Sequence, residues 1–271
     1  SMQSRPRKTA SFLSAHPVFT RAEFAAALGH PTGGANVTSL LRHHLRAGNI
    51  KRVSREVFAA VPAHLPAERT VIDRFVAASK LRPDGVLGFH SALELHGIAY
   101  SEFSEVQLIS RGRAELVDLP FGACRFIVPP KALAAAGQAD YLTMSMDRQG
   151  VALRVTAVER TVVDVLHRPE LAGGVEEVLK SLDLVRYLDP AKVADYVELL
   201  DNRSLASVSG WWLETRRAAL GVTDDVLARL RARLPRSKHY ALGAEPGHAV
   251  LVEPWRVLLP AQAVDAAFEG V

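Results

Sequence analysis

The first 62 residues carry the hydrophobic spacing of three short helices followed by a two-stranded hairpin, and this order constrains the fold more than any other feature. Apolar side chains recur at helical intervals over residues 7–15, 21–28 and 36–47. Thr20 is placed to cap the second helix, and Gly29 and Gly48 end the second and third. Residues 50–53 and 57–61 alternate as strands across a polar turn. The pattern predicts a winged helix-turn-helix over residues 1–62.

The same segment holds most of the positive charge of the chain. Residues 1–62 contain nine Lys and Arg against two acids, which gives +7, whereas the whole chain carries only +4 and the remainder −3. A small module with this balance attracts a polyanion and displaces its counterions on binding. The charge therefore indicates double-stranded DNA as the partner.

The third predicted helix separates an apolar face from a polar one. Val37, Leu41 and Leu45 fall on one side, and side chains that reach base edges and phosphates fall on the other. The basic hairpin would contact the DNA backbone as a wing. The expected DNA-binding residues are Asn36, Thr38, Ser39, Arg42, His43, Arg46, Lys51, Arg52, Arg55, Arg21, Arg7 and Lys8. Arg7 and Lys8 belong either to an N-terminal arm or to a frayed tail.

The rest of the chain, residues 66–271, predicts an α+β domain with a further division near residue 172. Strand-like runs occur at 105–110, 124–128, 141–146 and 151–156, and helical patterns dominate from residue 173 onward. We expect a small, largely antiparallel sheet followed by a helical C-terminal part. The overall fold class is therefore α+β, beginning with the winged helix-turn-helix.

The sequence offers no motif for catalysis, metal binding or a cofactor. Cys124 is the single cysteine, so a disulfide or a thiolate zinc site within the chain is excluded, and its apolar setting indicates a core residue. No GxSxG elbow, phosphate-binding loop or dinucleotide fingerprint occurs. Glu159, Arg160 and Asp164 lie among core-type valines and predict a buried ion pair or helix cap between domains. We expect a cytoplasmic protein without enzymatic activity, cofactor, metal or membrane segment.

A second basic cluster lies near the C-terminus. It has two interpretations, an additional binding surface for DNA or an acidic protein, or a solvated helical face. The residues of this possible second patch are Arg216, Arg217, Arg229, Arg231, Arg233 and Lys238. In the neighbouring helix, Trp211 and Trp212 are consecutive, so we expect one in the core and the other at a domain or partner contact.

Five segments carry motifs that extend beyond a generic helix-turn-helix. They are FTRAEFAAALG (19–29), SLLRHHLRAGNIKRVSREVFA (39–59), GFHSALELHG (88–97), VTAVERTVVDVLHRPELAGG (155–174) and GWWLETRRAALG (210–221). In this order the chain resembles the AbiEi-type antitoxins, the antitoxin half of abortive-infection toxin–antitoxin pairs. The resemblance implies a repressor of its own operon that binds inverted repeats in the promoter and whose remaining domain neutralises a nucleotidyltransferase-like toxin.

An inverted repeat requires two copies of the chain per operator. Three alternatives stay open. The chain could be a stand-alone winged-helix regulator without a toxin, an enzyme acting on nucleic acid with a basic targeting domain, or a module whose winged helix binds protein instead of DNA.

Overall fold

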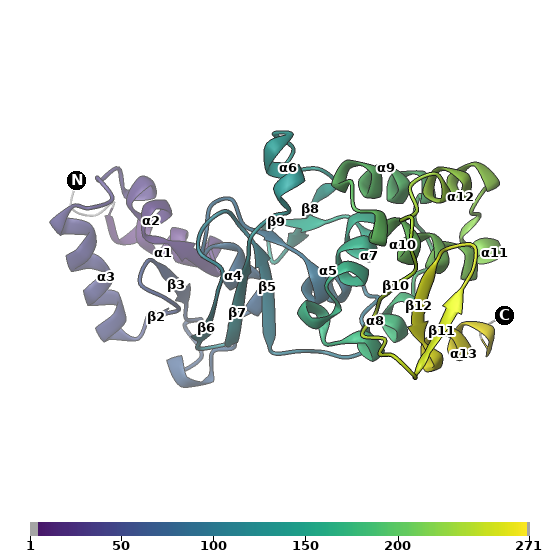
Figure 1. Cartoon of the computed structure of the whole chain (residues 1–271). Helices are drawn as coiled ribbons and strands as arrows, with labels where there is room; N and C mark the ends of the chain where they lie inside the picture. The colour runs from purple at the N-terminus through teal and green to yellow at the C-terminus, as the bar shows by residue number, and fades with distance from the viewer. Residues whose placement is uncertain (1–4, 270–271) are drawn as a thin grey trace. The chain divides into compact units, whose positions relative to one another are not determined.

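The structure, a computed structural model, describes residues 5–269, with side chains from residue 8 to residue 267, and is mixed α+β (Figure 1). Its contacts divide the chain into two compact units. Unit 1 contains residues 1–87, 104–128 and 145–155, and unit 2 contains residues 88–103, 129–144 and 156–271. This division differs from the boundary expected at residues 62–66, because strands that are distant in sequence pair with one another inside unit 1.

Unit 1 begins with an N-terminal module of three helices and a small sheet. The helices are α1 (Arg5–Ala15), α2 (Arg21–Leu28) and α3 (Ala35–Ala47). The sheet is antiparallel in the order β1-β3-β2, with β1 (Val18–Thr20), β2 (Ile50–Arg52) and β3 (Val57–Ala60). The three helices and the β2–β3 hairpin lie at the expected positions. The three-residue strand β1 was not expected, since so short a run has no readable alternation.

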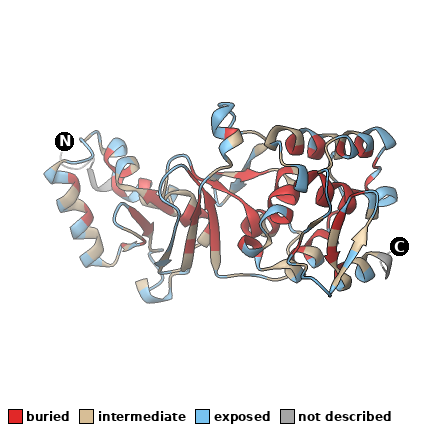
Figure 2. Cartoon of the chain, viewed as in Figure 1, coloured by how far each residue is buried: buried red, intermediate tan, exposed pale blue. Residues whose placement is uncertain are grey.

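Aromatic side chains form the core of the N-terminal module. Phe19 stacks between Phe24 and Phe58, with ring centroids 5.7 and 5.8 Å apart, and Phe12 meets Phe19 edge-on at 5.1 Å. Val37 and other apolar side chains of α3 complete this cluster, which is the red interior of the module in Figure 2. Edge-on and offset contacts at these distances are favourable beyond the area they bury.

The larger sheet of unit 1 has six strands in the order β6-β7-β5-β4-β9-β8. The strands are β4 (Val86–Leu87), β5 (Glu105–Ile109), β6 (Glu115–Leu119), β7 (Gly122–Ile127), β8 (Thr143–Arg148) and β9 (Val151–Thr156). The sheet is mixed, because β5–β7 and β4–β9 are parallel pairs and β6–β7 and β4–β5 are antiparallel. The expectation of a small, largely antiparallel sheet was therefore wrong. Strand β7 lies between β5 and β6 in the sheet. The hydrophobic pattern of each strand does not predict this order, because it reports only on neighbours along the chain.

Helix α4 (Arg74–Ser79) packs against strands of both sheets. A 3-10 turn, η1 (Ala67–Arg69), precedes it, and Asp73 is its N-cap. The Asp73 carboxylate accepts hydrogen bonds from the backbone N–H groups of Phe75 and Val76 at 3.1 and 3.0 Å. Such a cap satisfies donors that the first helical turn would otherwise leave unpaired.

Unit 2 is mainly helical, with a small three-stranded sheet. Its helices are α5 (Phe89–Leu95), α6 (Lys131–Ala135), α7 (Val158–His167), η2 (Pro169–Ala172), α8 (Val175–Leu182), α9 (Pro190–Leu200), α10 (Arg203–Thr215), α11 (Arg217–Leu220), α12 (Asp224–Arg231) and α13 (Ala261–Glu269). The sheet has the order β10-β12-β11, with β10 (His239–Tyr240), β11 (Ala249–Val252) and β12 (Val257–Pro260). Side-chain caps from Asp189, Asn202 and Thr223 start α9, α10 and α12.

Helix α10 is the central helix of unit 2 and contacts α7, α9, α12 and β12. Trp211 and Trp212 are both buried, with 5% and 3% of their surface exposed, so the prediction that only one of them lies in the core was wrong. A helix surrounded on all sides has no outward face for a second indole. Trp255 packs so closely on Gly210 that a Cβ atom there would lie 2.1 Å from its ring.

The ERTVVD motif forms a buried polar cluster on α7. Arg160 and Asp164 lie 3.5 Å apart and are almost fully buried, as the sequence indicated. Arg160 donates to the carbonyl oxygens of Ala139 and Tyr141 at 3.2 and 2.8 Å, and Tyr196 donates to Asp164 at 2.6 Å. All of these residues belong to unit 2, so the cluster stabilises one unit and does not join two domains. Burial raises the pKa of Asp164 to about 6, although Arg160 and Tyr196 oppose the shift.

His90 forms a second buried cluster in unit 2, between α5 and α8. Its Nδ1 lies 3.2 Å from Glu94 and its Nε2 lies 3.0 Å from Glu177, and its ring stacks on Phe103 at 3.8 Å. Burial raises the pKa of Glu177, but hydrogen bonds from His90 and from Ser101 outweigh it, so the net shift is downward. His90 of the GFHSALELHG segment therefore joins α5 to α8 through buried polar contacts.

We predict that Tyr196→Phe lowers the free energy of unfolding by about 1–3 kcal/mol, because it leaves a buried oxygen of Asp164 without its hydroxyl donor. Urea denaturation followed by circular dichroism measures the loss. Tyr187→Phe is the matched control, because 89% of Tyr187 is exposed. Equal stabilities of the two variants would contradict a structural role for the cluster.

Candidate nucleic-acid interface

Helix α3 presents one polar face to solvent. Val37 and Leu41 are buried in the aromatic core of the N-terminal module, and Leu40 and Leu45 pack against its edge. Because the helix turns by about 100° per residue, the residues opposite this stripe must point outward. The exposed polar side chains on this face are those of Asn36, Ser39, Arg42, His43 and Arg46. Five of the six α3 residues expected to contact DNA are thus exposed together.

Arg42 and Arg46 lie one helical turn apart on that face. Within residues 5–269, the structure gives neither guanidinium an ion pair or a hydrogen bond. An arginine without an internal acceptor keeps its five N–H donors available for phosphate or for guanine. These two side chains are the strongest candidates for contacting a polyanion.

Thr38 and Arg21 differ from this group because they bind each other. Arg21 donates from Nη2 to the Thr38 hydroxyl and from Nε to the carbonyl oxygen of Thr32 at 2.7 Å. The Arg21 guanidinium thereby joins the start of α2 to the loop that contains Thr32 and to the first turn of α3. Both residues were expected to contact DNA, but the structure places them in a brace that holds α3 against α2.

The two arginines of the β2–β3 hairpin differ in their contacts, because Arg52 binds the turn and Arg55 extends into solvent. Arg52 donates to the carbonyl oxygen of Arg55 at 2.9 Å, and its guanidinium lies 4.9 Å from the centre of the Phe58 ring, so it supports the turn. The side chain of Arg55 is 94% exposed, with Glu56 at 4.0 Å, and Lys51 is half-buried. Ion pairs this exposed contribute little, so Arg55 is free to exchange Glu56 for a phosphate.

The N-terminal basic residues belong to a helix, because α1 already begins at Arg5. Neither the extended arm nor the frayed tail expected for Arg7 and Lys8 is present over α1. Lys8 is exposed, whereas the side chain of Arg7 lies outside the described side chains.

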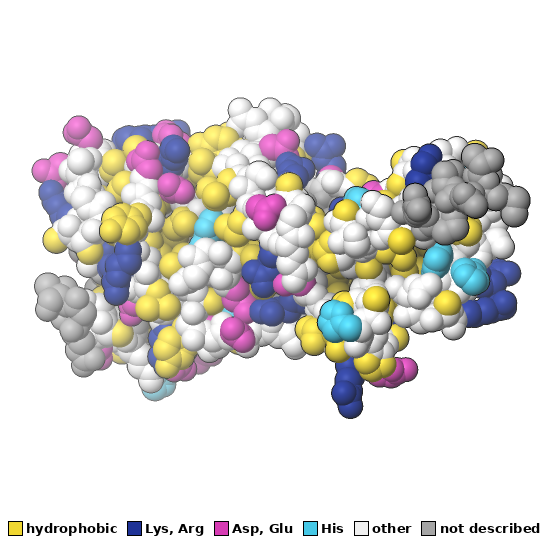
Figure 3. Space-filling model, turned by 180° about the vertical axis from the view of Figure 1, so that it is seen from behind, with side chains coloured by type: hydrophobic (Ala, Val, Ile, Leu, Met, Phe, Trp, Pro, Cys, Tyr) yellow, Lys and Arg dark blue, Asp and Glu magenta, His cyan; other side chains and the backbone are white. Residues whose placement is uncertain are grey.

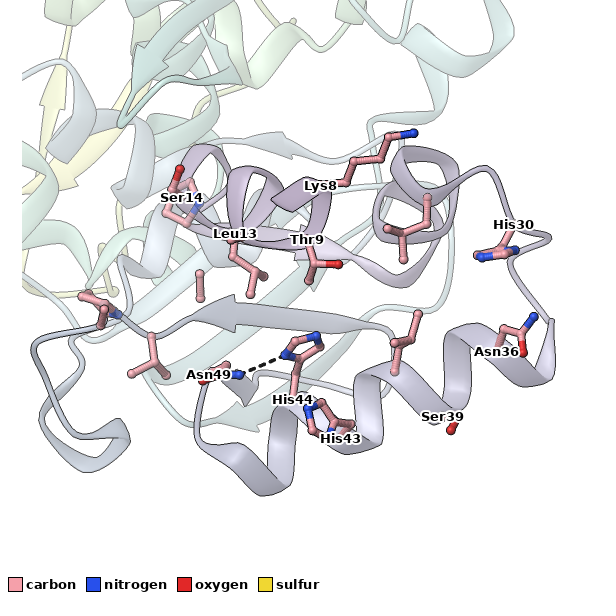
Figure 4. A pocket seen from close by; sticks show the side chains of 18 residues that line it. Lys8, Thr9, Leu13, Ser14, His30, Asn36, Ser39, His43, His44 and Asn49 are labelled. Carbon is pink, nitrogen blue, oxygen red and sulfur yellow. Dashed lines mark hydrogen bonds between the residues drawn. The ribbon is translucent and has the colours of Figure 1, made fainter. Parts of the chain in front are cut away.

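An open groove of about 1220 Å³ runs between α1 and α3 (Figure 4). Leucines form its apolar floor, and Lys8, Asn36, Ser39 and His43 are among its polar lining residues. At one end of the groove, His44 Nδ1 and Asn49 Nδ2 lie 3.0 Å apart. Burial, together with the neighbouring His43, lowers the pKa of His44. Sequence reasoning missed Asn49 and His30, which lie in turns and reach the groove only in the folded chain.

A partly buried salt bridge connects α2 to the sheet region of unit 1. Glu23 accepts from the backbone N–H of Thr20 at 3.0 Å and from Lys80 Nζ at 2.9 Å. Burial raises the pKa of Glu23, but the hydrogen bonds from Lys80 and Thr20 outweigh it, and the net shift is below 4.5. The capping carboxylate of α2 therefore also connects the N-terminal module to the residue that follows α4.

The two compact units carry opposite net charges. Unit 1 contains 18 Lys and Arg against nine Asp and Glu, which gives +9, and unit 2 contains 15 against 20, which gives −5. Figure 3 shows histidine, lysine and arginine side chains close together over the N-terminal module, on the right of the view. The excess of positive charge thus extends beyond residue 62 to the whole of unit 1.

The possible second basic patch consists largely of partnered arginines. Arg229 pairs with Asp195 and Glu198, Arg233 with Asp201, and Arg217 with Asp224. Arg216 donates to two backbone carbonyl oxygens at 2.8 and 2.6 Å. Of the six residues, Arg231 and Lys238 are exposed and have no such partner among the described side chains, those of residues 8–267. This pattern is typical of a solvated helical face held by salt bridges.

Among the described side chains, those of residues 8–267, no group of three His, Cys, Asp or Glu is placed to hold a metal ion. Cys124 is buried, and burial raises the pKa of its thiol to about 12. None of the described helices has the length and apolar character needed to cross a bilayer.

Comparison with known proteins identifies a structural relative. No protein-family model and no curated protein matches the sequence. The fold is similar to that of the RV2827C protein from Mycobacterium tuberculosis, whose crystal structure aligns with a TM-score of 0.60 over 97% of this chain and 94% of that one. The aligned residues are 17% identical, so the similarity shows a shared fold and nothing more.

We predict that Glu23→Gln destabilises the protein at neutral pH and that the difference from wild type shrinks in acid. A carboxylate whose folded-state pKa lies below its ordinary value of 4.5 stabilises the fold above that pH. The contribution is lost as the pH falls through the lowered pKa. Thermal denaturation from pH 7 to pH 3 tests this, with the exposed Glu56→Gln as the control. A difference that stays constant with pH would exclude the salt bridge as its source.

Proposed function

We propose that unit 1 is a sequence-specific DNA-binding unit whose N-terminal module acts as a winged helix-turn-helix. The observation that carries this proposal is the outward face of α3, where Arg42 and Arg46 are exposed and lack internal partners within residues 5–269. The face belongs to a unit of net charge +9, which attracts a polyanion from a distance.

The proposed division of roles follows from the contacts. Ser39, Arg42, His43 and Arg46 would read base edges in the major groove of one half-site. Arg55, at the turn of the hairpin, would bind phosphate as the wing, and Arg21 would act indirectly by holding α3 in position. A chain that reads one half-site needs a second copy to read an inverted repeat, so two copies per operator are part of the proposal.

We further propose that the chain is an AbiEi-type antitoxin that represses its own operon. The support is the order of its sequence motifs, two of which form buried polar clusters in unit 2. These are the His90 cluster in GFHSALELHG and the Arg160–Asp164 pair in the ERTVVD motif. In this proposal, unit 2 counteracts a nucleotidyltransferase-like toxin without catalysing a reaction, and its net charge of −5 favours a basic surface on that toxin.

Changing Arg42 and Arg46 together to Ala should weaken binding to a promoter fragment of the chain's own operon by about 10- to 100-fold and should relax sequence preference. Electrophoretic mobility shifts at about 0.15 M salt, with specific and scrambled duplexes, measure both effects.

The matched control for this experiment is Arg231→Ala with Arg236→Ala, which removes the same charge from exposed positions of unit 2. Unchanged affinity of the α3 variant, or an equal loss in the control, would overturn the assignment of α3.

The antitoxin proposal predicts that the chain binds the product of a neighbouring nucleotidyltransferase-like gene. Co-expression should relieve growth inhibition by that product, and the α3 double variant should still relieve it because its unit 2 is intact. Failure of the wild-type chain to relieve toxicity would leave a stand-alone regulator as the function.

A further inference from the structure

The loop between β5 and β6 is held from within by a single arginine. Arg82 Nη1 donates to the Ser110 hydroxyl at 2.8 Å, and Nη2 donates to the carbonyl oxygen of Arg113 at 3.0 Å. The Arg82 guanidinium also lies 3.7 Å from the centre of the Phe126 ring. Arg82 therefore fixes the backbone of the loop to the sheet.

Gly112, at the tip of this loop, makes room for that support. A Cβ atom at residue 112 would lie 2.8 Å from Arg82 Nη1, which is too close for an ordinary contact. Asp84 accepts a hydrogen bond from the backbone N–H of Arg111 at 2.8 Å, which holds the loop at a second point. Hydrogen bonds thus hold the backbone of the loop at Arg111 and at Arg113, on either side of Gly112.

The side chains of Arg111 and Arg113 project from this loop into solvent. Both residues are exposed, and within residues 5–269 neither guanidinium has an ion pair or hydrogen bond. Asp84 accepts a hydrogen bond from the backbone N–H of Arg111, and Glu115 Oε1 lies 3.4 Å from Arg82 Nη2. The loop therefore presents two exposed arginines that form no direct ion pair with either of these carboxylates.

Two sets of polar contacts, joined by the short segment from Lys80 to Arg82, connect the loop to the N-terminal module inside unit 1. Arg82 follows Lys80 by two residues, and Lys80 forms the salt bridge to Glu23 of α2. Arg21, in the same turn of α2, binds Thr38 of α3. The loop and the outward face of α3 belong to the same compact unit.

From these observations we propose that Arg111 and Arg113 form a second contact to the phosphodiester backbone of duplex DNA, flanking the half-site read by α3. The inference rests on the proposed DNA-binding function and adds a site outside the winged helix. Two guanidiniums on a preordered loop suit phosphate groups, which take parallel N–H donors without any requirement for base sequence. The contact would contribute affinity and salt dependence but not discrimination between sequences.

The test compares wild type with the Arg111→Ala/Arg113→Ala variant on the promoter fragment and on a scrambled duplex of equal length. Loss of two phosphate contacts should reduce the slope of log K against log salt by about 1.8 and weaken binding to both duplexes by a similar factor. The ratio of specific to scrambled affinity should stay constant, unlike in the Arg42→Ala/Arg46→Ala variant.

Two controls separate the possible failures. The Arg231→Ala/Arg236→Ala variant shows the effect of removing two charges elsewhere, and thermal denaturation shows whether the loop variant folds like wild type, as its exposed positions predict. If the wild-type chain binds DNA and the α3 variant does not, an unchanged salt slope in the loop variant overturns this inference alone. If the wild-type chain binds neither duplex, the proposed function itself fails.

Discussion

The packing of α3 on the aromatic core of the N-terminal module determines what the rest of unit 1 can do. Val37 and Leu41 occupy that core, beside Phe24 and Phe58. A rotation of the helix by one residue would bury Arg42 in place of Leu41, at a large cost for an unpaired charge. The burial of two aliphatic side chains therefore decides which polar side chains of α3 reach solvent, and the proposed DNA-reading face exists because the core permits no other orientation.

The arginines of unit 1 divide into supports and free cations, and the division follows from available acceptors. Arg21 and Arg82 each donate hydrogen bonds to oxygen atoms of separate segments of the chain. Their guanidinium groups therefore hold those segments together. Arg42 and Arg111 lie on exposed positions where the protein offers no such oxygens within residues 5–269. A support of this kind limits the conformations in which the unpaired cations are presented, which would lower the ordering cost of the proposed DNA binding.

In unit 2, charged and polar side chains of two sequence motifs form contacts in the interior. Arg160 and Asp164 are almost completely enclosed, and Tyr196 and two backbone carbonyls satisfy part of their hydrogen-bonding capacity. His90 likewise has a carboxylate at each ring nitrogen. Buried networks of this kind are sensitive to the loss of any one member, since the remaining polar atoms then stay dehydrated. The side chains that distinguish the ERTVVD and GFHSALELHG motifs thus form the buried polar contacts that hold the helices of unit 2 together.

Local periodicity was sufficient to predict α2 at its observed bounds, α3 to within one residue, and the polar side of α3, because each depends on neighbours within one or two helical turns. The same reasoning could not tell that Arg21 braces the turn while Arg42 is free, since the acceptor on Thr38 lies 17 positions away along the chain. It also missed the mixed six-stranded sheet, where Leu87 pairs with Val155. The sequence by itself thus determined the local elements and the charge, whereas only the tertiary structure decided which charges are neutralised, because hydrogen-bond partners are chosen by proximity in space.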